Sequence, residues 1–149
     1  MWNENKSLVL SKVFVIVFMV MLVVCIVLAP RVVESLLRRS AMANGAGAGL
    51  FLLTLYVGSV PAGALLVCML LLLKRISAGE VFVRQNISYL RFISWCLFIV
   101  GVICAASSLY YIPWLPISIM AAFMGLVVRV VKNIIAKAVS LQDDADFTI

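Results

Sequence analysis

The stretch from Asn44 to Leu73 decides the fold; it reads NGAGAGLFLLTLYVGSVPAGALLVCMLLLL and contains no charged residue. About 20 mainly apolar residues are enough to cross a bilayer core of about 30 Å, whereas an ideal helix over this stretch would be about 45 Å long. We therefore predict a transmembrane helix over residues 47–73. A membrane β-barrel is disfavoured because apolar and polar residues do not alternate along the stretch.

Three further apolar runs flank this segment, and they predict spans over residues 13–29, 92–111 and 113–131. The composition agrees, since 66% of the 149 residues are hydrophobic, 12% are charged and the mean hydropathy is +1.22. An average soluble domain is about 45–50% apolar and about 25% charged. We predict an all-α integral membrane protein in which four transmembrane helices form one domain over residues 1–149. The first run is longer than the apolar region of about 7–15 residues in a secretory signal, so an uncleaved helix is expected.

Lysine and arginine are distributed unevenly between the two sides of the predicted bundle. With four spans, nine fall on the side of the N-terminal tail, the inner loop 74–91 and the tail 132–149, against three on the other side. Short loops rich in these residues stay in the cytoplasm, so both termini are predicted to be cytoplasmic. The nine are Lys6, Lys12, Lys74, Arg75, Arg84, Arg91, Arg129, Lys132 and Lys137; the three are Arg31, Arg38 and Arg39.

Pro30 is expected to close the first span and to begin an outer interfacial helix over residues 31–43, because proline suits the first position of a helix. Glu34 and Arg38 are four residues apart and should pair on its polar side. A solvated connector is the favoured interpretation of this segment, and a ligand-sensing lid is the alternative.

Small residues surround Pro61 in the second span, and a further glycine lies in the fourth. Proline removes a backbone hydrogen bond and favours a kink, while glycine lets a neighbouring helix approach closely. We interpret this set as a kink and packing site, with a gated pore or hinge as the alternative. Its residues are Gly58, Pro61, Gly63 and Gly125.

The residues needed for catalysis or metal binding are scarce. The chain has no histidine, none of its six carboxylates lies in an apolar run, and the cysteines form no C-x-x-C pair. A nucleophile with a base, a carboxylate pair or a zinc site therefore cannot be assembled, and we expect neither an enzyme nor a bound cofactor or metal. The thiols are expected to behave as small hydrophobic groups; they belong to Cys25, Cys68, Cys96 and Cys104.

The inner loop contains a pattern that predicts the start of a helix. Val83, Ile87 and Leu90 form one apolar stripe, and Asn86 or Ser77 is the candidate N-cap. Arginines in the loop are placed to contact lipid phosphates. The motif that we select here consists of Gly79, Phe82, Asn86, Leu90 and Arg91.

This motif, together with the chain end Phe147-Thr148-Ile149 behind an acidic run, resembles the bacterial membrane-protein family known as domain of unknown function 2975. Phe147 stands where that family usually has leucine. The motifs cover the C-terminal half, whereas the first two spans are similar only in hydrophobicity. The resemblance implies four spans and a bacterial cytoplasmic (inner) membrane location. It implies no established activity, but genes of the family often neighbour those of small helix-turn-helix repressors.

The tail combines three acids within four residues with terminal apolar side chains. Such a run suits a basic protein surface, and Phe147 and Ile149 would supply apolar anchors. A solvated tail is the alternative. The predicted partner-binding residues are Asp143, Asp144, Asp146, Phe147 and Ile149.

From these patterns we expect a small inner-membrane protein that acts by protein–protein interaction, as a tether or sensor controlling a cytoplasmic helix-turn-helix transcription regulator. The expected partners are the lipid bilayer and that DNA-binding regulator, with no direct contact to nucleic acid; a homo-oligomer stays open. The alternatives are a passive pore or transporter subunit for a neutral solute, and a toxin-immunity protein.

Overall fold

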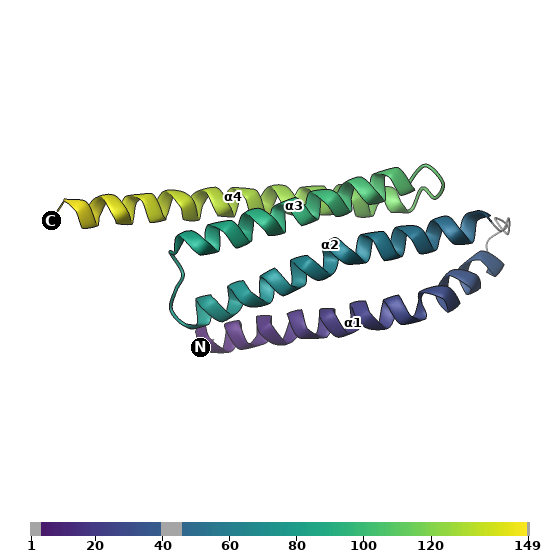
Figure 1. Cartoon of the computed structure of the whole chain (residues 1–149), viewed down its shortest axis with the longest axis horizontal. Helices are drawn as coiled ribbons and strands as arrows, with labels where there is room; N and C mark the ends of the chain where they lie inside the picture. The colour runs from purple at the N-terminus through teal and green to yellow at the C-terminus, as the bar shows by residue number, and fades with distance from the viewer. Residues whose placement is uncertain (1–3, 40–45, 149) are drawn as a thin grey trace.

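The computed structural model describes residues 4–39 and 46–148, and all regular structure in these ranges is α-helical. The helices are α1 (Glu4–Arg39), α2 (Ala46–Ser77), α3 (Arg84–Ser107) and α4 (Trp114–Phe147) (Figure 1). All four are long and apolar enough to cross a membrane. The prediction of an all-α fold with four potential membrane-spanning helices is therefore confirmed.

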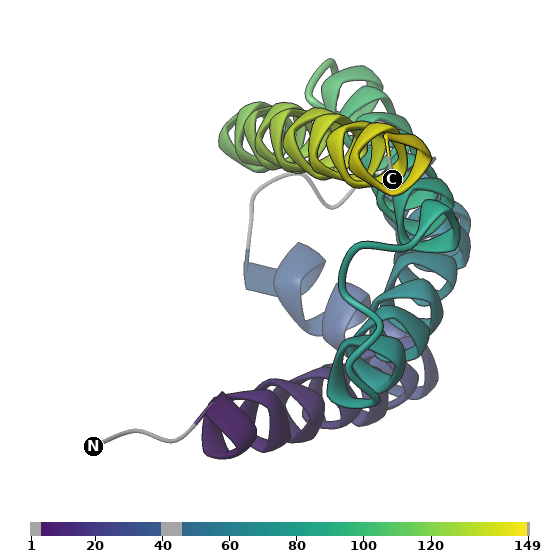
Figure 2. The same ribbon diagram turned by 90° about the vertical axis from the view of Figure 1, so that its left-hand side faces the viewer.

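The four helices lie in a single curved row and do not close into a ring. α1 packs on α2, α2 on α3 and α3 on α4, while within the described ranges α1 makes no contact with α4. Figure 2 shows the resulting arc end-on. Along the helix axes, the molecule has two ends. One end holds the start of α1, the α2–α3 loop and the end of α4, and we call it the terminal end. The α3–α4 turn lies at the opposite end, which we call the turn end.

Most large apolar side chains point away from the protein. Val27, Val60 and Val102, on three different helices, are 70, 71 and 68% exposed. Exposed apolar area costs about 25 cal/mol per Å² in water, so these outward faces require a lipid environment.

The predicted boundary at Pro30 is wrong, because α1 runs unbroken through it to Arg39. Neighbouring groups and local adjustments in a membrane helix compensate for the hydrogen bond that proline removes. Figure 1 shows that the last turns of α1 bend out of line with the rest of the helix. Glu34 and Arg38 pair as expected, at 2.6 Å between Oε1 and Nη2. Residues 40–43 of the predicted interfacial helix lie outside the described residues.

A glycine turn ends α2 and directs the chain into α3. The Glu80 N–H donates to the Arg75 carbonyl at 3.1 Å, and the Gly79 N–H donates to the Ile76 carbonyl at 3.1 Å. These two bonds form a Schellman motif, whose central residue is left-handed. Gly79 has φ +86°, a conformation that costs an L-amino acid about 1–2 kcal/mol.

The expected N-cap role of Asn86 and Ser77 is wrong. Val83 occupies the N-cap position of α3 without a side-chain hydrogen bond. Asn86 lies inside the first turn, is 1% exposed, and donates through Nδ2 to the carbonyls of Glu80 and Val81 at 2.6 and 2.9 Å. Asn86 therefore holds the α2–α3 loop in place from within α3. The spacing of residues in the sequence does not reveal this role.

Candidate functional site

At the terminal end, an apolar core between the helices fixes the direction of α4. Leu72 of α2 packs with Leu90 and Ile93 of α3, and Ile135 of α4 packs against this cluster. The Arg75 guanidinium lies 5.8 Å from the centre of the Tyr89 ring, a cation–π contact between α2 and α3. α4 therefore leaves the apolar region along a path set by α2 and α3.

Farther from the terminal end, small residues bring α3 and α4 close together. A Cβ at Gly101 would lie 3.4 Å from the Ser118 carbonyl oxygen, and a Cβ at Gly125 would lie 3.3 Å from Phe98 Cε1. Ser118 donates to the Gly101 carbonyl at 2.7 Å, and Ser94 donates to the Gly125 carbonyl at 3.0 Å. Of these residues, only Gly125 was selected from the sequence. The seven-residue spacings 94–101 and 118–125 are the signal that could have found the others.

A groove of about 520 Å³ lies between the start of α3 and the end of α4. We call it the inner groove. Arg84 and Asp143 close part of it with an ion pair of 2.7 Å between Nη2 and Oδ2. Further residues that line it are Ser88, Arg91, Val139, Asp144 and Phe147. The inner groove thus brings the predicted loop motif and the predicted tail residues to one place, through Arg91 on one helix and three tail residues on the other.

The tail is a continuation of α4 rather than a separate frayed segment. The helix extends to Phe147, and the Thr148 hydroxyl donates to the Asp144 carbonyl at 2.7 Å. Asp144 and Asp146 are exposed, and Phe147 is 91% exposed. Ile149 lies outside the described residues. Asp143 differs from the other two acids because it already has a cationic partner.

The loop motif divides into structural and exposed residues. Gly79 and Asn86 shape the α2–α3 connection, and Leu90 is buried in the core. Phe82 and Arg91 are exposed. Only these two have side chains free to contact another molecule, and Arg91 is the one that lines the inner groove.

The residues around Pro61 lie in the middle of α2, which continues through the proline. A Cβ at Gly63 would meet Leu22 Cδ2 of α1 at 3.6 Å, whereas a Cβ at Gly58 would meet nothing within 4 Å. Among the described residues, Gly58 therefore has no closely packed helix neighbour, which corrects the expectation for this residue. Gly58 lines an apolar pocket in the half of the molecule nearer the turn end.

Across residues 4–39 and 46–148, no three cysteine, aspartate or glutamate side chains are grouped as they would be around a metal ion. The four cysteines are free thiols, of which Cys96 and Cys104 are buried.

The fold and the exposed apolar faces define the class: the chain is an all-helical, multi-pass membrane protein. A family model described as protein of unknown function (DUF2975) matches residues 48–149. The chain therefore belongs to the DUF2975 family, as its motifs indicate, and the match begins in α2, ahead of those motifs. Neither a curated protein nor a solved structure matches this chain.

Proposed function

We propose that the protein is a bacterial inner-membrane tether or sensor that binds a cytoplasmic helix-turn-helix transcription regulator through the end of α4. The observation that carries this proposal is the exposure of Phe147. This residue is 91% exposed, and it lies on a regular helix beside two exposed acids. A large exposed aromatic side chain at a helix end beyond the apolar region is of the kind that anchors protein contacts.

The length of α4 supports a cytoplasmic position for this end. The helix has 34 residues, which at about 1.5 Å per residue extends about 51 Å, well beyond the hydrocarbon core. Its basic residues, Arg129, Lys132 and Lys137, come between the apolar part and the acids. Cations at this level suit the anionic phospholipids of the cytoplasmic leaflet, and the acids then extend beyond the headgroups.

The exposed acids support a partner with a basic surface. Asp143 is paired with Arg84, so Asp144 and Asp146 are the acids available to another molecule. A DNA-binding domain presents a basic surface that these acids would steer toward the membrane. Because exposed ion pairs add little affinity, Phe147 would supply most of the binding energy.

The family resemblance agrees with this partner, because genes of the family often neighbour those of small helix-turn-helix repressors. Sequestration at the membrane would hold such a regulator off its DNA until a signal altered the end of α4. In this proposal the protein acts by binding alone, without catalysis or a cofactor, and does not itself contact nucleic acid.

The proposal is tested by replacing the exposed residues while keeping the Arg84–Asp143 ion pair. A variant with Asp144→Asn, Asp146→Asn and Phe147→Ala should lose co-purification of the proposed helix-turn-helix regulator, and transcription of that regulator's target genes should change. Gln142→Ala, an exposed neutral change on the same helix, is the matched control. Unchanged co-purification and transcription in the triple variant would show that the tail is only a solvated end.

The predicted orientation has its own test, which uses single cysteines in a chain whose native cysteines are replaced. Leu109→Cys lies at the turn end, where Leu109 is 91% exposed, and Ser140→Cys lies on the exposed surface near the end of α4. An impermeant thiol reagent on intact cells should label the first and spare the second. The opposite pattern would reverse the orientation.

A further inference from the structure

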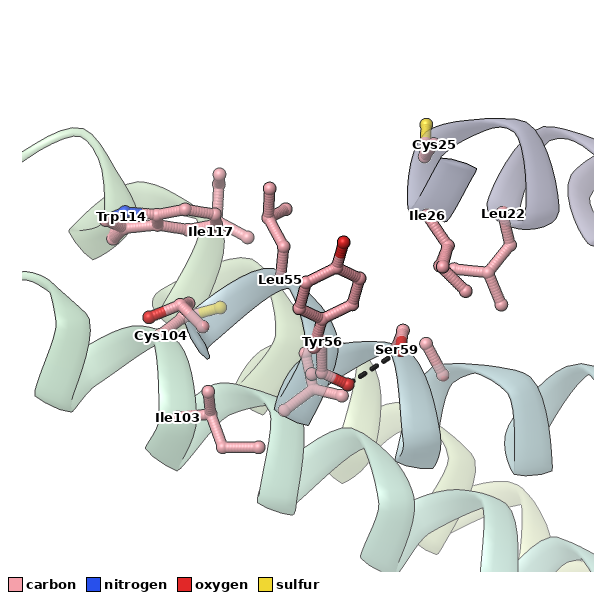
Figure 3. Close-up of a pocket in the computed structure, with 14 residues that line it drawn as sticks. Leu22, Cys25, Ile26, Leu55, Tyr56, Ser59, Ile103, Cys104, Trp114 and Ile117 are labelled. Atoms are coloured by element: carbon pink, nitrogen blue, oxygen red, sulfur yellow. Dashed lines mark hydrogen bonds between the residues drawn. The ribbon is translucent and has the colours of Figure 1, made fainter. Parts of the chain in front are cut away.

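The inner groove carries four charged side chains, and two of them are already paired. Arg84 and Asp143 form the ion pair of 2.7 Å, whereas Arg91 and Asp144 have no salt-bridge partner among the described residues. The groove therefore has no net charge, but it keeps one open cation and one open anion. The apolar pocket that Gly58 lines, shown in Figure 3, has no charged residue in its wall, so of these two hollows the inner groove is the one whose charges select a ligand.

The two open charges lean toward each other across the inner groove. α3 and α4 run in opposite directions (Figure 1), and the Cα–Cβ bonds of an α-helix tilt toward its N-terminus. The side chain of Arg91 therefore leans toward the terminal end, and that of Asp144 leans back toward the bilayer. Because both residues line the same groove, a molecule that meets both charges must carry an anion at one end and a cation at the other.

The order of these two charges relative to the bilayer follows from the helices that carry them. Arg91 directly precedes the uncharged part of α3, residues 92–107, so its guanidinium lies near the level of the lipid phosphates. Asp144 lies farther out, because its neighbour Asp143 pairs with Arg84, which is seven residues or about 10.5 Å nearer the start of α3. The cation therefore lies nearer the hydrocarbon and the anion beyond it.

We propose that the inner groove binds the headgroup of a phosphatidylethanolamine molecule, with the phosphate on Arg91 and the primary ammonium on Asp144. In this lipid the phosphate is attached to the glycerol, and the ammonium lies at the outer end of a two-carbon link, which is the order of the two protein charges. Both contacts are charge-assisted hydrogen bonds. The Ser88 and Ser140 hydroxyls, which also line the groove, are further donors to the phosphate oxygens.

Other headgroups satisfy only part of this site. Phosphatidylglycerol and free phosphate carry no cation, so they leave Asp144 unpaired and are repelled by it. Phosphatidylcholine has the same net charge as phosphatidylethanolamine, but its quaternary ammonium has no N–H to donate to a carboxylate. Each ionic contact alone is weak at an exposed site, so the lipid that meets both charges is retained over its neighbours. The assignment does not rest on the proposed regulator: the two surfaces share Asp144, but Arg91 belongs to the lipid site alone.

The experiment uses the full chain, without any regulator, in nanodiscs of phosphatidylethanolamine and phosphatidylglycerol. A water-soluble carbodiimide activates a carboxylate, and a lipid amine in contact with it then forms an amide bond with net loss of water. Peptide mapping should find the lipid amide at Asp144 several-fold more often than at Asp146, an exposed acid two residues away that is outside the groove lining. This comparison is made within the wild-type chain, so it needs no variant.

Two exposed substitutions then test each end of the headgroup. Arg91→Gln should lower amide formation at Asp144 several-fold, whereas Arg129→Gln, an exposed arginine outside the groove lining, should not. Asp144→Asn leaves the groove with a net positive charge. Native mass spectrometry of the chain released from these nanodiscs should therefore show retained lipid shifting from phosphatidylethanolamine to phosphatidylglycerol, and Asp146→Asn should show no such shift.

Three outcomes would overturn the assignment. One is equal amide formation at Asp144 and Asp146, or formation at Asp144 that Arg91→Gln leaves unchanged, which would mean that the amine meets the acids only as part of a general lipid surface. Another is the same lipid preference in the wild type and Asp144→Asn. The last is equally efficient coupling of glycerophosphoethanolamine, which has the headgroup without the chains, because a soluble phosphodiester would then be the ligand.

Discussion

Gly101→Leu should be the most damaging single change in the α3–α4 contact. A Cβ at this position would lie 3.4 Å from the Ser118 carbonyl oxygen and 3.5 Å from the Ala122 backbone nitrogen. Those distances are ordinary contacts for a methyl group, so Gly101→Ala should be tolerated. The three further carbons of leucine have no such room, because the facing atoms belong to the backbone and cannot rotate away.

The expected cost of Gly101→Leu follows from these contacts. Overpacking a well-filled interface costs about 1–3 kcal/mol, and separating the helices also breaks the Ser118 bond to Gly101 and the Ser94 bond to Gly125, each worth about 0.6 kcal/mol in a membrane protein. We expect a loss of about 2–4 kcal/mol relative to Gly101→Ala, which carries a similar gain in helix propensity.

The assay is reversible unfolding in mixed micelles, followed by helical circular dichroism as a denaturing detergent is added. Gly49→Leu compared with Gly49→Ala is the control, since an added Cβ at Gly49 meets no atom of the described residues within 4 Å. A difference below about 0.5 kcal/mol between the two Gly101 variants would refute the close approach of α3 and α4.

Three other predictions concern the terminal end. Gly79→Ala should cost about 1 kcal/mol in the same unfolding assay because of its positive φ, whereas Gly49→Ala should not destabilise the protein; equal effects would contradict the left-handed turn. Asn86→Ala and Asn86→Asp should each cost about 2 kcal/mol of stability, since both variants lose the donor to the Glu80 and Val81 carbonyls. Both should also speed hydrogen exchange in the α2–α3 loop, and unchanged exchange would refute this role. A double-mutant cycle on Arg84 and Asp143 should give a weak coupling that falls with salt, because the Arg84 side chain is 82% exposed. A strong coupling that is insensitive to salt would be inconsistent with a surface pair.

The helical class and the existence of four apolar helices could be predicted because each depends on local composition. A run such as residues 47–73 has no soluble alternative that would bury so many apolar side chains. Family membership could also be predicted from two short motifs. Helix ends were harder, since Pro30 resembles a helix start when only its neighbours in the chain are considered. Whether a proline begins a helix or lies within one depends on the surrounding contacts.

The packing partners could not be predicted because they depend on which helices are neighbours. Gly58 and Gly125 look alike in sequence, yet Gly125 faces Phe98 and Gly58 faces a pocket. The Arg84–Asp143 pair joins residues 59 apart in the chain, so no local spacing reveals it. That pair changes the interpretation of the tail, because it removes one of the three predicted acids from the surface offered to a partner.

The most direct measurement for the proposed function is the affinity, for the full chain in nanodiscs, of a purified helix-turn-helix regulator of the kind whose genes often neighbour those of the family. The account predicts saturable binding that weakens at least tenfold, or about 1.4 kcal/mol, in the variant with Asp144→Asn, Asp146→Asn and Phe147→Ala. It also predicts no change with Gln142→Ala. Absence of binding to the wild type, or equal affinity for the wild type and the triple variant, would contradict the proposal.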